Sequence, residues 1–518
     1  IQKGIHIVVG EMGTVNKNNT ADRIAWGIFY LRSARRFQFT PFIWDNNQYD
    51  NRISCEETFG QFMRSDLTWA NPELIDVYLL ESKKPLLDDP DLFRIEPEEA
   101  YDPLDMEVDY GQVEWDDSIT SDKLVEEMGL GWNLGNTLDA FDDDHKGLNS
   151  ELSWGNPETT EEMIDVLVDK GFKAVRIPVT WHNHLIDRKY TIDPEWMWRV
   201  KTVVDWCIYK GLYVILNTHH DNANHKVLPI NYGEGYYPLN KDAEESERFL
   251  YNVWKQIAYA FNEGYDHHLV FETLNEPRMR DLDNEWWYKK GDATCDEAAN
   301  ILNEYNKLIL KAIRETGGNN VHRFVMVTPL AASYDFAINS PFVLPDDKSY
   351  NPKNNKIIIS VHMYAPHALV QKADMSVTKF TEQYEKELSN NFYNLYTTFV
   401  QKGYNVIIGE FGSINKNNKS SRLAWGNYYI TNARKNRMTP FLWDNGIWDN
   451  SESCAHTYGL FNRKELEWVD EDIVDEYLDA GKISFPTIKN PSSETTTDYW
   501  DKYWSEFDCS KLTSSGQL

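Results

Sequence analysis

The sequence predicts an α/β protein: a (β/α)8 barrel of the TIM type, preceded by a partial copy of the same fold. Two observations lead to this prediction. Eight short, mostly apolar segments alternate with stretches in which apolar residues recur at helical spacing. In addition, a stretch near the start of the chain is repeated near its end at a constant offset of 399 residues. Alternating strands and helices predict a parallel sheet, and eight strands predict its closure into a barrel.

Residues 1–80 repeat the end of the predicted barrel. Segment 4–13 aligns with 403–412, and segment 40–46 aligns with 439–445, without a gap. We interpret residues 1–80 as the last two strand-helix units of a preceding barrel in a tandem array. Such a quarter barrel has unpaired strand edges and is not expected to be stable alone. Alternatively, this segment exchanges into the barrel of a neighbouring chain, because Glu11 and Glu410 lie in near-identical strands that compete for one position.

Residues 81–120 have the composition of a linker. They hold fourteen Asp and Glu against three Lys and Arg, together with four prolines, and like charges keep such a chain extended. Residues 483–518 form a second polar segment with an aromatic cluster at Tyr499, Trp500, Tyr503 and Trp504. The complete catalytic barrel is therefore expected over residues 121–482.

The overall composition narrows the classes of partner. A net charge of −30 argues against nucleic acid and anionic membranes and suits a neutral polymer. Aromatic residues make up 14% of the chain, and their flat faces are what sugar rings stack on. No run of 18 apolar residues occurs, and the five cysteines form no metal-binding pattern, although their scatter permits one or two disulfides. The chain starts inside a strand-like segment without a signal peptide, which we interpret as truncation of a secreted protein.

The eight predicted strands follow one another from residue 131 onward. They cover residues 131–135, 175–178, 213–219, 270–276, 323–328, 357–362, 406–410 and 440–443. Helical patterns lie between them, for example over residues 161–170, where Gly171 follows as a C-terminal cap. In a parallel barrel, polar residues at the carboxyl ends of the strands are expected to form the active site.

Two of these strands deliver a glutamate at their carboxyl end. Segment 269–277 ends in Asn275, Glu276 and Pro277, and segment 404–412 carries Glu410 between Gly409 and Gly412. Glycines on either side allow the backbone to bend around that glutamate. Two carboxyl groups about 5 Å apart are what a retaining glycosidase uses as its general acid/base and its nucleophile.

Residues at six strand ends, taken in order, carry a family resemblance. Residues 121–482 resemble glycoside hydrolase family 5, most closely the endoglucanase subfamily of rumen bacteria and anaerobic fungi. The matching residues are Arg176, His219, His220, Asn275, Glu276, His362, Tyr364, Glu410 and Trp443.

This resemblance implies a retaining endo-β-1,4-glucanase that needs no cofactor and no metal, with Glu276 as acid/base and Glu410 as nucleophile. Xyloglucan, mixed-linkage glucan, glucomannan and xylan remain as alternative substrates. A non-catalytic carbohydrate-binding barrel is the alternative of another class.

The other residues of the motif are expected to support the two glutamates. Arg176 would keep Glu410 ionised, Tyr364 would hydrogen-bond the nucleophile, and Asn275 would contact the sugar 2-hydroxyl. His362 shares a strand face with Tyr364, Trp443 would stack beneath the sugar at the cleaved bond, and one of His219 and His220 would contact a sugar hydroxyl. Further candidate substrate contacts are Asn136, Trp132, Trp154, Trp181 and Tyr236.

Metal ligation has little support in the sequence. His219, His220 and Asp221 lack a further ligand at a usual spacing. The acidic run at residues 142–144 could bind calcium, but no ligand spacing supports this.

Overall fold

The computed structural model describes residues 8–17, 20–36, 39–50, 57–83, 113–142, 146–230, 233–352 and 355–488. The chain divides into two compact units, Ile1–Ala100 and Tyr101–Leu518, which we call the first and the second unit. Within the described residues, no helix has both the length and the apolar character needed to cross a membrane.

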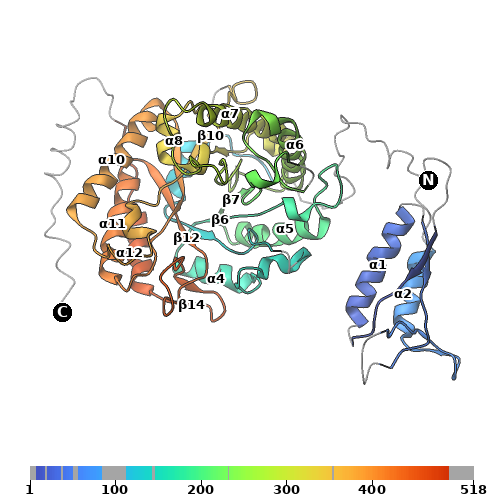
Figure 1. Ribbon diagram of the computed structural model, residues 1–518. Helices are drawn as coiled ribbons and strands as arrows, with labels where there is room; N and C mark the ends of the chain where they lie inside the picture. The colour runs from blue at the N-terminus through green and yellow to red at the C-terminus, as the bar shows by residue number, and fades with distance from the viewer. Residues whose placement is uncertain are drawn as a thin grey trace. The chain divides into compact units, whose positions relative to one another are not determined.

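Eight parallel strands close into a barrel in the second unit, as predicted (Figure 1). Each strand pairs with the next along the chain, and the last pairs back with the first. The strands are β5 (Gly131–Leu134), β6 (Ala174–Ile177), β7 (Tyr213–Asn217), β8 (Leu269–Glu272), β9 (Val325–Val327), β10 (Ile357–His362), β11 (Asn405–Phe411) and β12 (Met438–Asp444).

Helices surround this barrel (Figure 1). They are α3 (Ser121–Glu127), α4 (Glu161–Lys170), α5 (Pro194–Tyr209), α6 (Ala243–Ala260), α7 (Ala293–Arg314), α8 (Tyr334–Asn339), α9 (His367–Val370), α10 (Glu382–Thr398), α11 (Lys419–Lys435) and α12 (Glu471–Gly481). A short hairpin of β13 (Phe461–Asn462) and β14 (Glu467–Trp468) precedes α12. Local sequence fixes several helix ends: Asp193 caps α5 ahead of Pro194, and Gly171 ends α4 with a φ of 108°.

The interior of the barrel changes from apolar to polar toward the carboxyl ends of the strands. The lower part is filled by side chains such as Ile215, Val270 and Phe441, and Trp115 packs against this cluster from below. Above it lies a set of buried polar side chains that hydrogen-bond across the barrel and that we call the polar layer: Asn133, Arg176, Asn217, Glu272 and Ser360. The polar layer is the platform on which the strand-end residues rest.

Two strands end at least two residues earlier than predicted, and three others end one residue earlier. β8 stops at Glu272 and β7 stops at Asn217, so Glu276 and the two histidines 219 and 220 lie in the loops that follow. The backbone still holds these loops in place, because the Asn275 N–H donates to the Thr218 carbonyl at 2.9 Å. Leaving the regular strand lets the side chain of Glu276 turn toward the barrel mouth.

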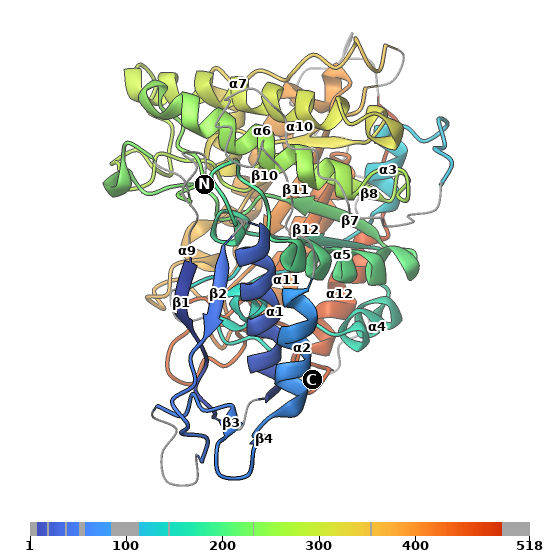
Figure 2. The same ribbon diagram turned by 90° about the vertical axis from the view of Figure 1, so that its right-hand side faces the viewer.

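The first unit contains a two-stranded parallel sheet with two helices packed along it (Figure 2). Its elements are β1 (Val8–Met12), α1 (Thr20–Arg36), β2 (Thr40–Ile43), β3 (Phe62–Met63), β4 (Thr68–Trp69) and α2 (Pro72–Ser82). Moving these bounds by 399 residues places β1 within β11, β2 within β12, and the other four elements on α11, β13, β14 and α12. The packing is also repeated: a Cβ on Gly27 would lie 1.8 Å from Tyr78, and one on Gly426 would lie 2.0 Å from Tyr477.

The two units differ in what covers the matching strands. Val8 and Phe42 are 59% and 57% exposed in the first unit. Their counterparts Ile407 and Phe441 are fully buried in the barrel interior. Among its described residues, the first unit therefore carries a barrel-type inner face that is left exposed at Val8 and Phe42.

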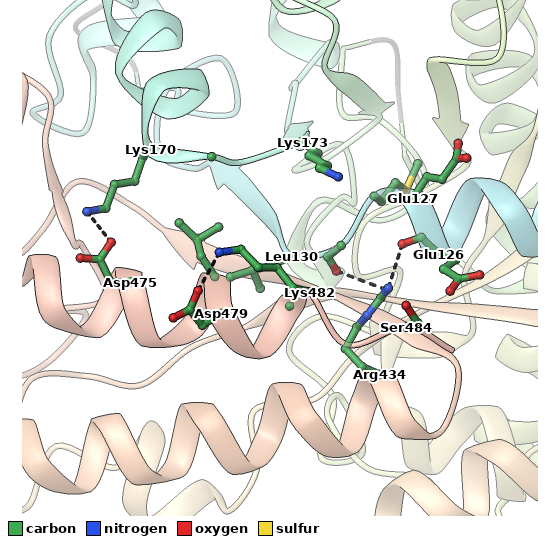
Figure 3. A pocket seen from close by; sticks show the side chains of 15 residues that line it. Glu126, Glu127, Leu130, Lys170, Lys173, Arg434, Asp475, Asp479, Lys482 and Ser484 are labelled. Atoms are coloured by element: carbon green, nitrogen blue, oxygen red, sulfur yellow. Dashed lines mark hydrogen bonds and ion pairs between the residues drawn. The ribbon is translucent and has the colours of Figure 1, made fainter. Parts of the chain in front are cut away.

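A cavity of about 690 Å³ lies at the amino-terminal ends of the barrel strands (Figure 3). Its charged side chains are paired locally: Lys170 with Asp475, Lys482 with Asp479, and Arg434 with the Glu126 carbonyl. Because it lies at the end opposite to Glu276 and Glu410, we assign it to packing between the strand starts and the helix ends.

Candidate active site

Glu276 and Glu410 meet at the carboxyl end of the barrel. Oxygens of the two carboxyl groups and a nitrogen of His362 all lie within 4.8 Å of one another. Glu410 is 5% exposed, and the side chain of Glu276 is 18% exposed. The approach of one oxygen from each carboxyl group to within 4.8 Å is consistent with a retaining glycosidase, whose two carboxyl groups lie about 5–5.5 Å apart.

A β-bulge aims Glu410 into the site. The pairing of β11 with β10 shifts between Val361 and His362, and its pairing with β12 shifts between Ile408 and Phe411. Gly409 lies inside this bulge, where a Cβ would come within 3.1 Å of Nε2 of His362. Glycine was expected beside Glu410 so that the backbone could bend, but neither Gly409 nor Gly412 has a positive φ. The requirement at position 409 is steric, because a side chain there would crowd the residues beneath Glu410.

Arg176 connects the two sides of the site. Its Nη1 donates to Oε1 of Glu410 at 2.8 Å, and its Nη2 donates to Oδ1 of Asn275 at 2.7 Å. Its Nε donates to Oε2 of Glu272 at 2.8 Å. Because the guanidinium is fully buried and fixed on several sides, its charge acts on Glu410 with little screening by water.

His362 and Tyr364 approach the glutamates from the end of β10. Nδ1 of His362 lies 2.9 Å from Oε1 of Glu276 and 3.6 Å from Oε2 of Glu410. The Tyr364 hydroxyl donates to Oε2 of Glu410 at 2.9 Å. Burial raises the pKa of Tyr364 well above 10, and the Glu410 charge raises it further, so the hydroxyl remains a donor throughout the range in which proteins fold.

The two glutamates differ in their affinity for a proton. Burial raises the pKa of Glu410, and the neighbouring Glu276 raises it further, against the opposing charges of His362 and Arg176. Burial also acts to raise the pKa of Glu276, but the hydrogen bond and charge of His362 and the charge of Arg278 outweigh it, so this pKa is lowered.

His219, and not His220, is the histidine that faces Glu410. Its Nε2 lies 3.9 Å from Oε1 of Glu410, and its ring is parallel to that of Trp443 with centroids 5.9 Å apart. Burial lowers the pKa of His219 well below its usual value, which makes it a neutral hydrogen-bonding group. His220 is half-buried and turns its Nε2 toward Oδ2 of Asp139 at 3.5 Å.

Trp443 and Trp154 keep partly exposed side chains near the site. The ring of Trp443 lies over Gly135, where a Cβ would be 2.7 Å away. Trp154 packs edge-on against His220 at 5.2 Å. Asn136 is half-buried next to Gly135, with a φ of 58°.

The prediction of a sugar-stacking role is wrong for three of the aromatic residues. Trp181 and Tyr236 are fully buried, and Trp132 is 1% exposed. The indole N–H of Trp181 donates to the Asn217 carbonyl, so its ring is part of the packing around the polar layer. Aromatic residues near a strand end are equally suited to core and to cleft, and the sequence alone did not separate the two.

The prediction overlooked the polar layer apart from Arg176. Within or at the end of the apolar strands lie Glu272, Asn133, Asn217 and Ser360. A signal for them existed, since charged and amide side chains in a buried strand need partners.

Side chains of the types that can bind a metal ion form three clusters among the described residues. These groups are Asp139 with His219 and His220; Asp266 with His267 and His268; and Glu276 with His362 and Glu410. In the third group the carboxylates already accept hydrogen bonds from His362, Arg176 and Tyr364, as expected for acid–base chemistry.

Three of the five cysteines, Cys207, Cys295 and Cys454, are free and buried. The other two, Cys55 and Cys509, lie outside the described ranges, as do residues 143–145 of the acidic run.

A model of the family Cellulase (glycosyl hydrolase family 5) matches residues 138–449. Endoglucanase A of Clostridium longisporum is 40% identical over 388 residues, which are 73% of this chain and 69% of that protein.

Two solved structures share the fold of the second unit. The GH5 lichenase of Caldicellulosiruptor sp. F32, in complex with cellotetraose, has a TM-score of 0.64 at 35% identity and covers 74% of this chain and 100% of its own. A GH5-4 broad specificity endoglucanase from Ruminococcus champanellensis with bound cellotriose has a TM-score of 0.62 at 36% identity, covering 70% of this chain and 98% of its own.

Proposed function

The chain belongs to glycosyl hydrolase family 5, and on that premise we propose how its barrel divides the hydrolysis of β-1,4-glucan between two carboxyl groups. The protein is an endo-β-1,4-glucanase that acts with retention of configuration. Glu410 is the nucleophile and Glu276 is the general acid/base. The observation that carries this assignment is the approach of their oxygens to within 4.8 Å.

The first step forms a glycosyl-enzyme. A carboxylate oxygen of Glu410 attacks the anomeric carbon, the glycosidic C–O bond breaks, and Glu276 gives its proton to the departing oxygen. In the second step a water attacks the same carbon, Glu276 takes a proton from that water, and Glu410 leaves as a carboxylate. Asn275, held by Arg176, is placed to hydrogen-bond the sugar 2-hydroxyl.

Substrate binding is proposed to bring the two glutamates into the protonation states that the reaction needs. Without substrate the pKa of Glu410 is raised and that of Glu276 is lowered, which are the opposite of the two shifts that attack requires. A sugar at the cleavage point develops positive charge beside Glu410 and presents a basic oxygen to Glu276. Both changes favour the ionised nucleophile and the protonated acid.

We propose a broad substrate range within β-1,4-linked glucans, including mixed-linkage glucan and xyloglucan. Relatives of the same fold are named as lichenase, broad specificity endoglucanase and xyloglucan-specific glucanase. Hydrolysis of each of these polymers would use the same two carboxyl groups, so the catalytic pair does not restrict the substrate to one of them. Initial rates on carboxymethyl cellulose, lichenan, xyloglucan, glucomannan and xylan would test this range, and activity on a single polymer would contradict it. The alternative of a non-catalytic binding barrel is not retained, because the relatives are enzymes.

A trapping experiment tests the assignment of the nucleophile. The full chain is incubated with a 2-fluoro-cellobioside that carries a good leaving group, and the labelled peptide is mapped by mass spectrometry. Label on Glu410 is expected. Label on Glu11 would mean that the first unit supplies the nucleophile, and an unlabelled but folded protein would contradict the retaining cellobiosyl mechanism.

We also propose that the protein acts outside the cell, because a polymeric glucan does not enter cells. Fractionation of the native culture with an antibody against the second unit tests this location. Recovery in the cell lysate alone would contradict it.

The first unit is proposed to be the closing quarter of a second barrel, whose other strands come from a neighbouring barrel segment or chain. Its exposed inner face at Val8 and Phe42, and the bulge between Val9 and Met12 that matches the one at Glu410, support this proposal. In material from the native source, trapping label on both Glu11 and Glu410 is expected. Label on Glu410 alone would count against a second working barrel.

A further inference from the structure

Glu272 is a second buried carboxylate beneath the nucleophile. It is the last residue of β8 and is fully buried. Its Oε2 accepts hydrogen bonds from Nε of Arg176 at 2.8 Å and from Nδ2 of Asn217 at 2.7 Å, and its Oε1 accepts from the Ser360 hydroxyl at 2.5 Å. All of these partners are donors, which is the set that an ionised carboxylate takes.

Arg176 therefore has two carboxylates as partners. Its Nη1 reaches Glu410 at 2.8 Å, and its Nη2 lies 2.7 Å from Oε2 of Glu272. Burial acts to lower the pKa of Arg176, but the charges of Glu272 and Glu410 outweigh it and the pKa is raised. One of these two carboxylates changes its charge during the reaction and the other does not.

We propose that Glu272 is a positioning residue that serves as the permanent counterion of Arg176, so that Glu410 can give up its negative charge when it forms the glycosyl ester. This inference rests on the proposed role of Glu410 as nucleophile. When Glu410 attacks the anomeric carbon, its carboxylate becomes a neutral ester. If Glu410 were the sole counterion, Arg176 would then be a buried, unpaired cation, which is costly in a protein interior.

The proposal predicts opposite effects on the two chemical steps. Glu272→Gln keeps the shape of the side chain but removes its charge, so Arg176 would act on Glu410 alone. The Glu410 carboxylate would be held more strongly as an anion, which makes it a poorer nucleophile and a better leaving group. Ester formation should slow, whereas ester hydrolysis should accelerate.

Trapping kinetics separate these two steps in the full chain. With 2,4-dinitrophenyl 2-deoxy-2-fluoro-cellobioside, we expect Glu272→Gln to be inactivated about tenfold more slowly than the wild type, and the trapped ester to reactivate faster. Loss of packing alone would slow both steps or neither. Unchanged or slower reactivation would overturn the proposal.

Glu151 offers a matched control. It is also a buried glutamate that bonds a buried arginine, with Arg199 at 2.9 and 3.0 Å, but it makes no contact with Arg176 or Glu410 among the hydrogen bonds of the described residues. Glu151→Gln should lower Tm without changing the ratio of inactivation to reactivation. If Glu272→Gln behaves in the same way, Glu272 has only a structural role.

A second variant covers the case in which Glu272→Gln does not fold. Glu272→Asp keeps the charge but draws the carboxylate back from Arg176, so it is expected to slow inactivation and speed reactivation in the same direction as Glu272→Gln and to a smaller extent. Unchanged or slower reactivation in a folded Glu272→Asp protein would overturn the proposal. Labelling of the wild type tests the role of Glu410 separately from the role of Glu272. If the wild type carries no label on Glu410, the assignment of the nucleophile is wrong, whatever the Glu272 variants show.

Discussion

The hydroxyl of Tyr364 donates a 2.9 Å hydrogen bond to the carboxylate oxygen Oε2 of Glu410. Together with Arg176, which donates to the other oxygen at 2.8 Å, it fixes the plane of the nucleophile. The geometry leaves the carboxylate with little freedom to rotate, so attack on the sugar needs little reorganisation.

Removing this hydroxyl tests the contribution of the bond. Tyr364→Phe is expected to lower kcat/KM on lichenan about tenfold to a hundredfold, because a hydrogen bond to a charged group contributes about 1.5–3 kcal/mol. The measurement is steady-state kinetics with circular dichroism as a check of folding. A value of kcat/KM within twofold of the wild type would show that Arg176 alone positions Glu410.

The roles of the two glutamates can be separated with substrates of different leaving groups. Glu276→Gln should lower the rate on cellulosic substrates about a thousandfold, because general acid–base catalysis typically contributes 10²–10⁴-fold. With 2,4-dinitrophenyl cellobioside, whose leaving group needs no proton, the same variant should still form the ester and show a burst of dinitrophenolate.

Glu410→Gln provides the contrast, since it should show no burst with either substrate. Added azide should accelerate turnover by Glu276→Gln, because an anion needs no general base to attack the ester. A burst from Glu410→Gln, or none from Glu276→Gln, would reverse the assignment.

The fold could be predicted because the pattern of apolar strands is local and repeated. All eight strands were found in their order, since each is a short apolar run between helical stretches. The end of β8 was misplaced from Glu272 to Glu276, because a loop that continues to hydrogen-bond its neighbours has the same composition as a strand. Strand boundaries depend on tertiary pairing, which the sequence does not display.

The site was predictable only in part. Glu276, Glu410, Arg176, His362 and Tyr364 come together because residues at the carboxyl ends of parallel strands share one edge. Which histidine faces Glu410, and whether Trp181 is core or cleft, depends on side-chain directions in loops. Glu272 and Asn217 were overlooked although the two residues are register partners on neighbouring strands, which is a pairing that becomes visible only once the barrel is assembled.

The segment directly before α3 is expected to stabilise the barrel. Trp115 packs against Phe324 with ring centroids 6.0 Å apart, and the Val113 N–H donates to the Glu263 carbonyl at 2.9 Å. Deleting residues 1–112 should therefore leave activity and Tm close to those of the full chain. Deleting residues 1–118 removes Trp115 as well and should cost about 3 kcal/mol, in line with losses of a buried aromatic side chain.

Thermal and urea denaturation of the two shortened proteins measure this difference. Equal stability of both would contradict the role of Trp115. An insoluble product from the 1–112 deletion would show that the second unit depends on the first.

Metal removal is expected to leave hydrolysis unchanged. The carboxylates of Glu276 and Glu410 are engaged by His362, Arg176 and Tyr364, which supply the charges that the reaction needs. Dialysis against EDTA followed by an assay on lichenan tests this, with metal content measured before and after. Loss of activity that is restored by a divalent ion would instead assign a metal role to one of the three His and carboxylate groups.

His184 is expected to make the stability of the protein depend on pH below about 6.5. It is 4% exposed, its ring lies parallel to that of Trp196 at 3.7 Å, and its Nε2 is 3.0 Å from the Ser150 hydroxyl. Burial lowers the pKa of His184 to about 3, with the charge of His182 adding to the effect, whereas a histidine in the unfolded chain titrates near pH 6.5. Between these values the unfolded chain binds a proton that the folded chain does not, so stability from this residue is complete above about pH 6.5 and is lost as the pH falls toward 3.

Replacing His184 by a residue that does not titrate should therefore flatten this dependence. At pH 5 the wild type is expected to have lost about 2 kcal/mol through His184, and His184→Gln should lose less between pH 7 and pH 5 even if it is less stable at pH 7. Urea unfolding at several pH values measures the slope, with His367→Gln, at an exposed position on α9, as the control. The slope decides the question because a change in packing alone shifts the free energy of unfolding equally at every pH. Equal slopes for the wild type and His184→Gln would therefore show that acid sensitivity arises elsewhere.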